Sequence, residues 1–286
     1  MKNIIKSLKF ILYLSKYSQD NYPKTNIVDD SYLGLDGKAV PLKILSRIDR
    51  NDKNAIIIFP GASHDAEKHP GLLFLGSIIC KLGYQVIIPC IPPLKMLKID
   101  ETCFDWFAHA YSKIIDRNDV KKQVSTMALS FGGAILLGAS LDKRISNNPP
   151  KSIMTFGTYS DIQTTLNFLC NGMISIDNQK YKIKPHSWGL MILLHNFLDK
   201  LNFKEITNYK LEIKKIIGLK ILDKHKEVEI ELNKLPNEPK IFINKIFDSN
   251  ITKDISKEIE RVLDDQKVFI NKMSPKHWGS KVKSKV

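Results

Sequence analysis

The stretch that decides the fold runs from Ser125 to Ser140 and reads STMALSFGGAILLGAS. It begins as a short apolar run, turns through Ser130, Phe131 and two glycines, and continues as a second apolar run. A buried strand that turns sharply into a helix exposes the side chain at the turn. The pattern therefore predicts a nucleophile elbow with Ser130 as the catalytic nucleophile. Ala128 stands where such an elbow usually has glycine, and alanine is small enough for the strand and helix to remain close.

A second stretch, NAIIIFPGAS, precedes the elbow and runs from Asn54 to Ser63. Ala55 to Phe59 are all apolar, so both faces of a strand made from them would be apolar. This is typical of a central parallel strand covered on both sides. A serine elbow needs backbone N–H groups that point at the developing oxyanion, one from the residue after the serine and one from a loop after an upstream strand. We therefore predict the N–H groups of Phe131 and Ala62 as the oxyanion donors.

Strand-like and helix-like runs alternate between these two stretches and around them. A hairpin is expected between residues 30 and 50, and further strands and helices follow in turn up to residue 158. Such alternation predicts an α/β fold with a mostly parallel sheet. From Ser160 onward helical periodicity dominates. We therefore predict an N-terminal amphipathic helix and linker over 1–29, an α/β core over 30–158 and a mainly helical region over 159–286.

Three segments, 57–95, 127–139 and 156–172, together resemble bacterial members of the α/β-hydrolase superfamily. The resemblance covers roughly residues 30 to 200. It implies a mostly parallel sheet with a helical cap after strand six, Ser130 as nucleophile, and Ala62 and Phe131 as oxyanion donors. It also implies an acid after the seventh strand and a histidine after the eighth. The expected function is hydrolysis, without a cofactor, of an ester or thioester that has an apolar acyl portion.

Two interpretations of the C-terminal region bear on the missing acid and histidine. In the first, PKIFINKIFDSN is a strand that ends at Asp248, and the later loop SPKHWGS presents His277, so that both complete a triad with Ser130. In the second, apolar pairs that recur four residues apart make the same segments helical. The helical patterns favour the second interpretation. In that case the chain stops before the strand that carries the acid, and the protein is a catalytically incomplete hydrolase-like protein or a binding module.

Composition limits the partners of the chain. Its 44 Lys and Arg exceed its 30 Asp and Glu and give a formal charge of +14, but no nucleic-acid-binding motif accompanies the charge, so no nucleic-acid partner is predicted. His64 and His69 precede the serine and lack a third ligand nearby, so no metal site is predicted. The expected partner is a small acyl substrate; its identity and the oligomeric state stay open.

The cysteines and the N-terminal segment bear on localisation. Four cysteines lie far apart in mostly apolar segments, which predicts reduced core thiols in a cytoplasmic protein. Ile4, Leu8, Ile11 and Leu12 repeat at helical spacing and predict an amphipathic helix. We expect this helix to pack on its own domain; the alternative is weak contact with a membrane surface.

Overall fold

The structure is a computed structural model, and it describes residues 2–49, 52, 54–121, 123–177, 179–249 and 252–284. The chain forms two compact units: Met1–Ser160 together with Met273–Val286, and Asp161–Lys272. The first division falls close to residue 158, where the sequence changes character. Residues 273–286, however, group with the first unit. No helix in the described ranges has the length and apolar character needed to cross a membrane.

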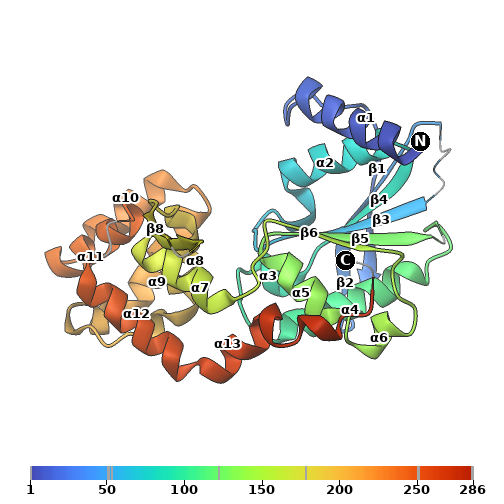
Figure 1. Ribbon diagram of the computed structural model, residues 1–286. Helices are drawn as coiled ribbons and strands as arrows, with labels where there is room; N and C mark the ends of the chain where they lie inside the picture. Colours follow the sequence, from blue (N-terminus) through green and yellow to red (C-terminus); the bar gives the residue numbers. More distant parts are fainter. Residues whose placement is uncertain are drawn as a thin grey trace. The chain divides into compact units, whose positions relative to one another are not determined.

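The first unit contains the six-stranded sheet that the sequence predicts (Figure 1). Its strands lie in the order β1-β2-β4-β3-β5-β6. The strand β2 pairs antiparallel with β1 and with β4, whereas β4, β3, β5 and β6 run parallel to one another. The strands are β1 (Asn26–Leu33), β2 (Ala39–Ser46), β3 (Asn54–Phe59), β4 (Tyr84–Pro89), β5 (Val124–Leu129) and β6 (Ile153–Phe156).

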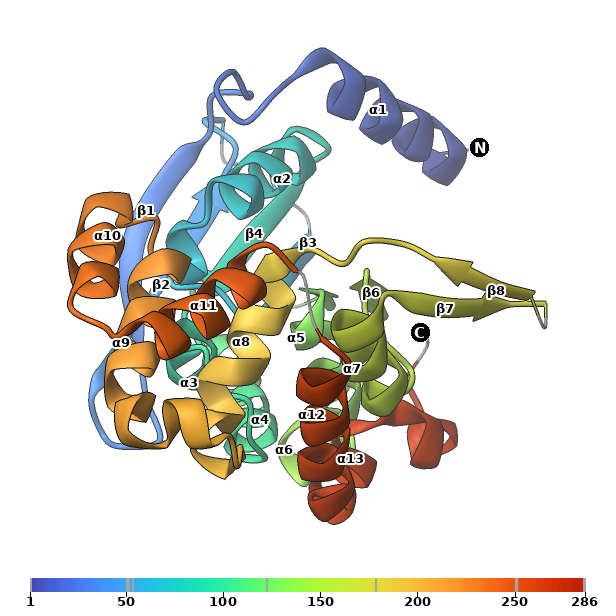
Figure 2. The same cartoon turned by 90° about the vertical axis from the view of Figure 1, so that its left-hand side faces the viewer.

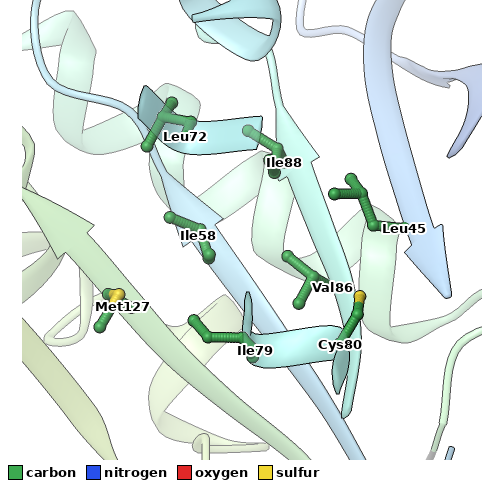
Figure 3. Close-up of a cluster of buried hydrophobic side chains, with 8 residues drawn as sticks. All are labelled: Leu45, Ile58, Leu72, Ile79, Cys80, Val86, Ile88 and Met127. Carbon is green, nitrogen blue, oxygen red and sulfur yellow. The ribbon is translucent and has the colours of Figure 1, made fainter. Parts of the chain in front are cut away.

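Helices cover both faces of this sheet, as the apolar run of β3 predicts. On one face Ile58 of β3 and Val86 of β4 pack with Leu72 and Ile79 of helix α2 (Pro70–Lys81) (Figure 3). On the other face Phe59 stacks on Phe107 of helix α4 (Thr102–Ile115), with ring centroids 4.6 Å apart. Successive side chains of a strand point to opposite faces, so each central strand contributes to both layers of the core.

Further helices and 3₁₀ turns belong to the first unit. They are helices α1 (Lys2–Lys16), α3 (Pro92–Lys95), α5 (Phe131–Ala139) and α6 (Lys143–Ser146), and the 3₁₀ turns η1 (Ala66–Lys68), η4 (Pro275–His277) and η5 (Gly279–Lys281). The last two turns belong to the segment that follows the second unit. The Lys276 N–H donates to the Ser160 carbonyl over 2.9 Å, and the Trp278 ring lies edge-on to Phe104. These contacts attach the C-terminal segment to the sheet-containing unit.

The second unit is mainly helical, as predicted, and it contains one small hairpin. Its α-helices are α7 (Ile162–Asn171), α8 (Ser187–Phe197), α9 (Lys210–Ile221), α10 (His225–Asn233), α11 (Asn237–Phe247) and α12 (Lys253–Asp265), with the 3₁₀ turns η2 (Leu198–Lys200) and η3 (Lys204–Tyr209). The hairpin pairs β7 (Met173–Ile176) with β8 (Gln179–Lys182). The sequence did not predict this hairpin, because its four-residue strands are too short and too exposed to show a clear period.

The strand interpretation of the C-terminal region is wrong. Its first candidate strand is helix α11, whose apolar residues Phe242, Ile243 and Ile246 are buried along one side. Its second candidate strand is helix α13 (Lys267–Met273). The physical reason is the period: adjacent apolar pairs that recur four residues apart bury one face of a helix, whereas in a strand the two members of each pair would point to opposite faces.

Candidate active site

Ser130 lies at the turn between β5 and α5, in the backbone geometry of a strained elbow. Its φ is 51° and its ψ is −131°, values that residues other than glycine seldom adopt. The Ser130 N–H donates to the Phe156 carbonyl of β6 over 2.8 Å, and the Ser130 carbonyl accepts from the Gly133 N–H over 3.0 Å. The residue is exposed. Two hydrogen bonds therefore hold an exposed serine in an unfavourable conformation.

Glycines let the loop after β3 approach this elbow closely. A Cβ built on Gly132 would lie 2.2 Å from the Pro60 carbonyl oxygen, so only glycine fits there. A Cβ on Gly61 would lie 3.3 Å from the Ser130 Cβ. The loop that carries Ala62 therefore starts directly against the elbow, which is the arrangement expected of an oxyanion loop.

The two predicted oxyanion donors come directly after residues in these close contacts: Ala62 follows Gly61, and Phe131 follows Ser130. Phe131 is the first residue of α5, so its N–H lies outside the hydrogen bonds of the helix. The positive end of the helix dipole adds to the attraction that this N–H exerts on an anion. Within the described ranges, the Ala62 N–H donates to no backbone carbonyl. Both groups are thus available as donors, and their part in catalysis remains a prediction.

The topology and the elbow together decide the fold class. A single strand, β2, runs against the other five in the described sheet. The serine turn follows β5, and the loop packed against it follows β3, the two places where an α/β hydrolase has its nucleophile and its oxyanion loop. The first unit has the α/β-hydrolase fold. The mainly helical second unit follows strand β6 in the chain.

Comparisons with known proteins found similarity to solved structures alone, at low sequence identity. No protein-family model matches the chain, and no curated protein matches it. Among solved structures, a dienelactone hydrolase from Anabaena variabilis is 11% identical with a TM-score of 0.39, over 51% of this chain and 68% of that one. A dienelactone hydrolase-like promiscuous phosphotriesterase from metagenomic libraries is 13% identical with a TM-score of 0.37, over 48% and 62%. A fungal esterase from Rhizomucor miehei is 13% identical with a TM-score of 0.39, over 56% and 53%. The matched part thus spans 53% to 68% of these three proteins.

The structure does not place Asp248 or His277 at the end of a sheet strand. Asp248 follows α11 in the second unit and is exposed. His277 lies in the 3₁₀ turn η4 of the first unit and is exposed as well. In the part of the chain that the structure describes, α11 and α13 replace the two strands on which their triad roles depended. These roles therefore keep no support from the α/β-hydrolase topology.

Three further histidines lie in the first unit, and each has a structural partner. The His69 Nδ1 accepts from the Gly71 N–H over 3.1 Å and caps α2. The His109 Nε2 lies 2.7 Å from the Leu33 carbonyl oxygen. Burial lowers the pKa of His64, which a hydrogen bond with the backbone of Lys95 partly offsets. His64 therefore favours its neutral form inside the oxyanion loop.

The cysteines are not competing nucleophiles. All four, Cys80, Cys90, Cys103 and Cys170, are free and buried, as predicted. Burial raises the pKa of each thiol to about 12. The thiolate is the reactive form, so these residues act as small apolar core groups. Across the described ranges, no three His, Cys, Asp or Glu side chains are grouped as metal ligands.

Sequence reasoning missed two residues beside the elbow. Thr158 packs against the first turn of α5, so closely that a Cβ built on Gly133 would lie 2.7 Å from the Thr158 Cβ. The Tyr159 ring centroid lies 6.0 Å from that of Phe131. The Thr158 and Tyr159 hydroxyl oxygens are both buried without a hydrogen-bond partner in the described part of the chain. Their position after β6, at the same end of the parallel strands as Ser130, is the signal that could have identified them.

Proposed function

We propose that the protein is a serine hydrolase that cleaves esters or thioesters with an apolar acyl portion. The observation that carries the proposal is the strained backbone of Ser130, which has a positive φ where the elbow packs against the Pro60–Gly61 loop. Strained backbone persists where the surroundings enforce it, and it is concentrated at active sites. The rings of Phe131 and Tyr159 support the preference for an apolar acyl group beside the nucleophile.

In the proposed reaction the Ser130 Oγ attacks the acyl carbonyl carbon, and its proton passes through water to the leaving oxygen or sulfur. The N–H groups of Ala62 and Phe131 donate hydrogen bonds to the oxyanion that forms. The C–O or C–S bond to the leaving group then breaks, and the leaving alcohol or thiol takes up a proton. Water attacks the resulting acyl-serine, releases the carboxylic acid and restores the Ser130 hydroxyl.

Labelling with a serine-directed fluorophosphonate tests this proposal. The expected result is a single adduct on Ser130 of the folded protein and none on Ser130→Ala or on the urea-unfolded wild type, because the reaction needs the assembled elbow. Hydrolysis of p-nitrophenyl esters then tests the acyl preference, and octanoate should react faster than acetate. The absence of an adduct on folded wild-type protein would contradict the proposal.

A second candidate is an α/β-hydrolase-like protein that binds an acyl compound without turning it over. The helical structure of α11 and α13 favours it, since these are the two segments that were expected to be the strands before the acid and the histidine. This candidate predicts equal ester hydrolysis by wild type and Ser130→Ala, together with calorimetric binding of the acyl compound to both.

A further inference from the structure

The N-terminal helix α1 carries an apolar face that stays exposed among the described residues of the first unit. Five apolar side chains of this face are between 51% and 65% exposed: Ile4, Ile5, Leu8, Ile11 and Leu12. The helix packs on its own domain, as expected, but these five side chains are not the ones that it packs there. Five large apolar side chains on one helix face form a continuous surface, unlike single apolar residues scattered over a protein.

The opposite side of the same helix attaches it to the first unit. Phe10 packs against the core cluster beneath α2. The Lys6 Nζ lies 4.2 Å from the centre of the Tyr84 ring, and the Lys81 Nζ lies 5.4 Å from that of Tyr13. At 100° per residue, positions 6, 10 and 13 lie on one side of a helix and positions 4, 8, 11 and 12 on the other. Helix α1 thus lies on the outer side of α2, away from the sheet (Figures 1 and 2). Its second apolar face is exposed to solvent.

The charge of the helix identifies the kind of surface that fits this face. Its sequence, KNIIKSLKFILYLSK, contains four lysines and no acidic residue. Lys9 and Lys16 are exposed and lie beside the apolar stripe. A second copy of α1 packed face to face would bring these like charges together, which is unfavourable. An anionic lipid surface instead offers an apolar layer for the stripe and negative headgroups for the lysines.

We infer that the exposed face of α1, made of Ile4, Ile5, Leu8, Ile11 and Leu12, lies in the surface of an anionic phospholipid bilayer, with the helix parallel to the membrane plane. The contact is peripheral. The first unit, with Ser130, is held at the membrane surface by its N-terminal helix. This placement would bring the protein to lipid-associated acyl compounds, but the inference is independent of catalysis.

Vesicle co-sedimentation of the full-length protein tests this inference. The protein should sediment with phosphatidylcholine vesicles that contain about one third phosphatidylserine, bind pure phosphatidylcholine vesicles less, and dissociate in high salt. The double variant Leu8→Ser/Ile11→Ser should bind roughly tenfold or more weakly, because it removes two of the inserted side chains. The matched control Leu211→Ser/Ile241→Ser changes two exposed apolar residues, 80% and 53% exposed, on helices α9 and α11. This control should bind like the wild type.

Two outcomes would overturn the inference. One is a wild-type protein that does not sediment with the anionic vesicles. The other is a Leu8→Ser/Ile11→Ser variant that binds them as well as the wild type while keeping the wild-type melting temperature. Light scattering of the same samples identifies the competing occupant: a dimer that dissociates in the double variant, together with no vesicle binding, would assign the face to a second copy of the chain.

Discussion

At the scale of single residues, the conformation of Ser130 stores energy that the fold does not otherwise need. Its φ of 51° is costly for any side chain with a Cβ, by about 1–3 kcal/mol. Glycine adopts this region freely but loses about 0.5–1 kcal/mol more entropy on folding than alanine does. We therefore expect Ser130→Gly to unfold at a higher urea concentration than Ser130→Ala, with a gain of about 1 kcal/mol. Equal midpoints for the two variants would show that the turn is relaxed.

A second residue-scale prediction concerns His64 in the oxyanion loop. Burial lowers its folded-state pKa below the ordinary value of 6.5. Its contribution to stability is therefore complete above pH 6.5. As the pH falls from there towards the folded-state pKa, the unfolded chain takes up the proton first, and stability decreases. Between about pH 7.5 and pH 5.5, His64→Gln should thus lose less thermal stability than the wild type. Parallel curves for the two proteins would contradict this prediction.

The sequence predicts those residues of the site whose position is determined by their own short segment, and it misses those whose position depends on contacts with distant segments. Ser130, Gly132 and Ala62 were predictable because an elbow and its loop are short patterns next to recognisable strands. Tyr159 was not, because nothing in its own segment shows that its hydroxyl would be buried beside Phe131. The predicted role of His277 depends on two expected strands, and both of those segments are helices.

At the scale of elements, the sequence predicts the type of structure best where one period is unambiguous. The run of β3 buries side chains on both faces, and its apolar continuity can be explained only by a covered strand or a buried helix segment. In α11 the apolar pairs favour a helix, although β-branched and aromatic residues are frequent there. Burial of one helical side outweighs strand propensity in this segment, so the period was the better guide than the residue types.

The strand β6 forms one edge of the described sheet, and this position leads to a prediction about association. It pairs only with β5 within the described sheet, and Met154 and Phe156 on one of its faces are 55% and 74% exposed. An open apolar edge is a template for pairing with another chain. We expect the mass measured by light scattering to rise with protein concentration for the wild type. The rise should be absent for Met154→Lys/Phe156→Lys, because lysine on an edge opposes pairing.

A matched variant separates edge pairing from general stickiness. Ile230→Lys/Val268→Lys replaces two side chains that are 56% and 73% exposed on helices α10 and α13. It should associate as the wild type does. Association that decreases equally in both double variants would attribute the effect to net charge instead of to the strand edge.

At the scale of the whole molecule, the first unit is discontinuous in sequence. Its sheet is complete by residue 160, yet residues 273–286 return to it after the whole second unit. No local pattern predicts this return, since Trp278 meets Phe104 across more than a hundred intervening residues. The change of composition at residue 158 predicts the exit from the first unit, but no such change marks the return to it.

The same discontinuity yields a prediction about independent folding. The Ser160 carbonyl oxygen and the Lys276 nitrogen are 2.9 Å apart, so the two ends of the first unit meet. Replacing residues 161–272 by a flexible linker of about six Gly and Ser residues should therefore give a protein that unfolds cooperatively on heating. Deleting residues 273–286 from that protein as well removes the Trp278 ring from Phe104 and turn η4 from α5. The apolar surface buried by these contacts contributes about 2 kcal/mol to the free energy of unfolding. Its loss should lower the melting temperature by roughly 4–8 °C. An excised protein without a cooperative transition would instead show that the sheet-containing unit folds only together with the helical one.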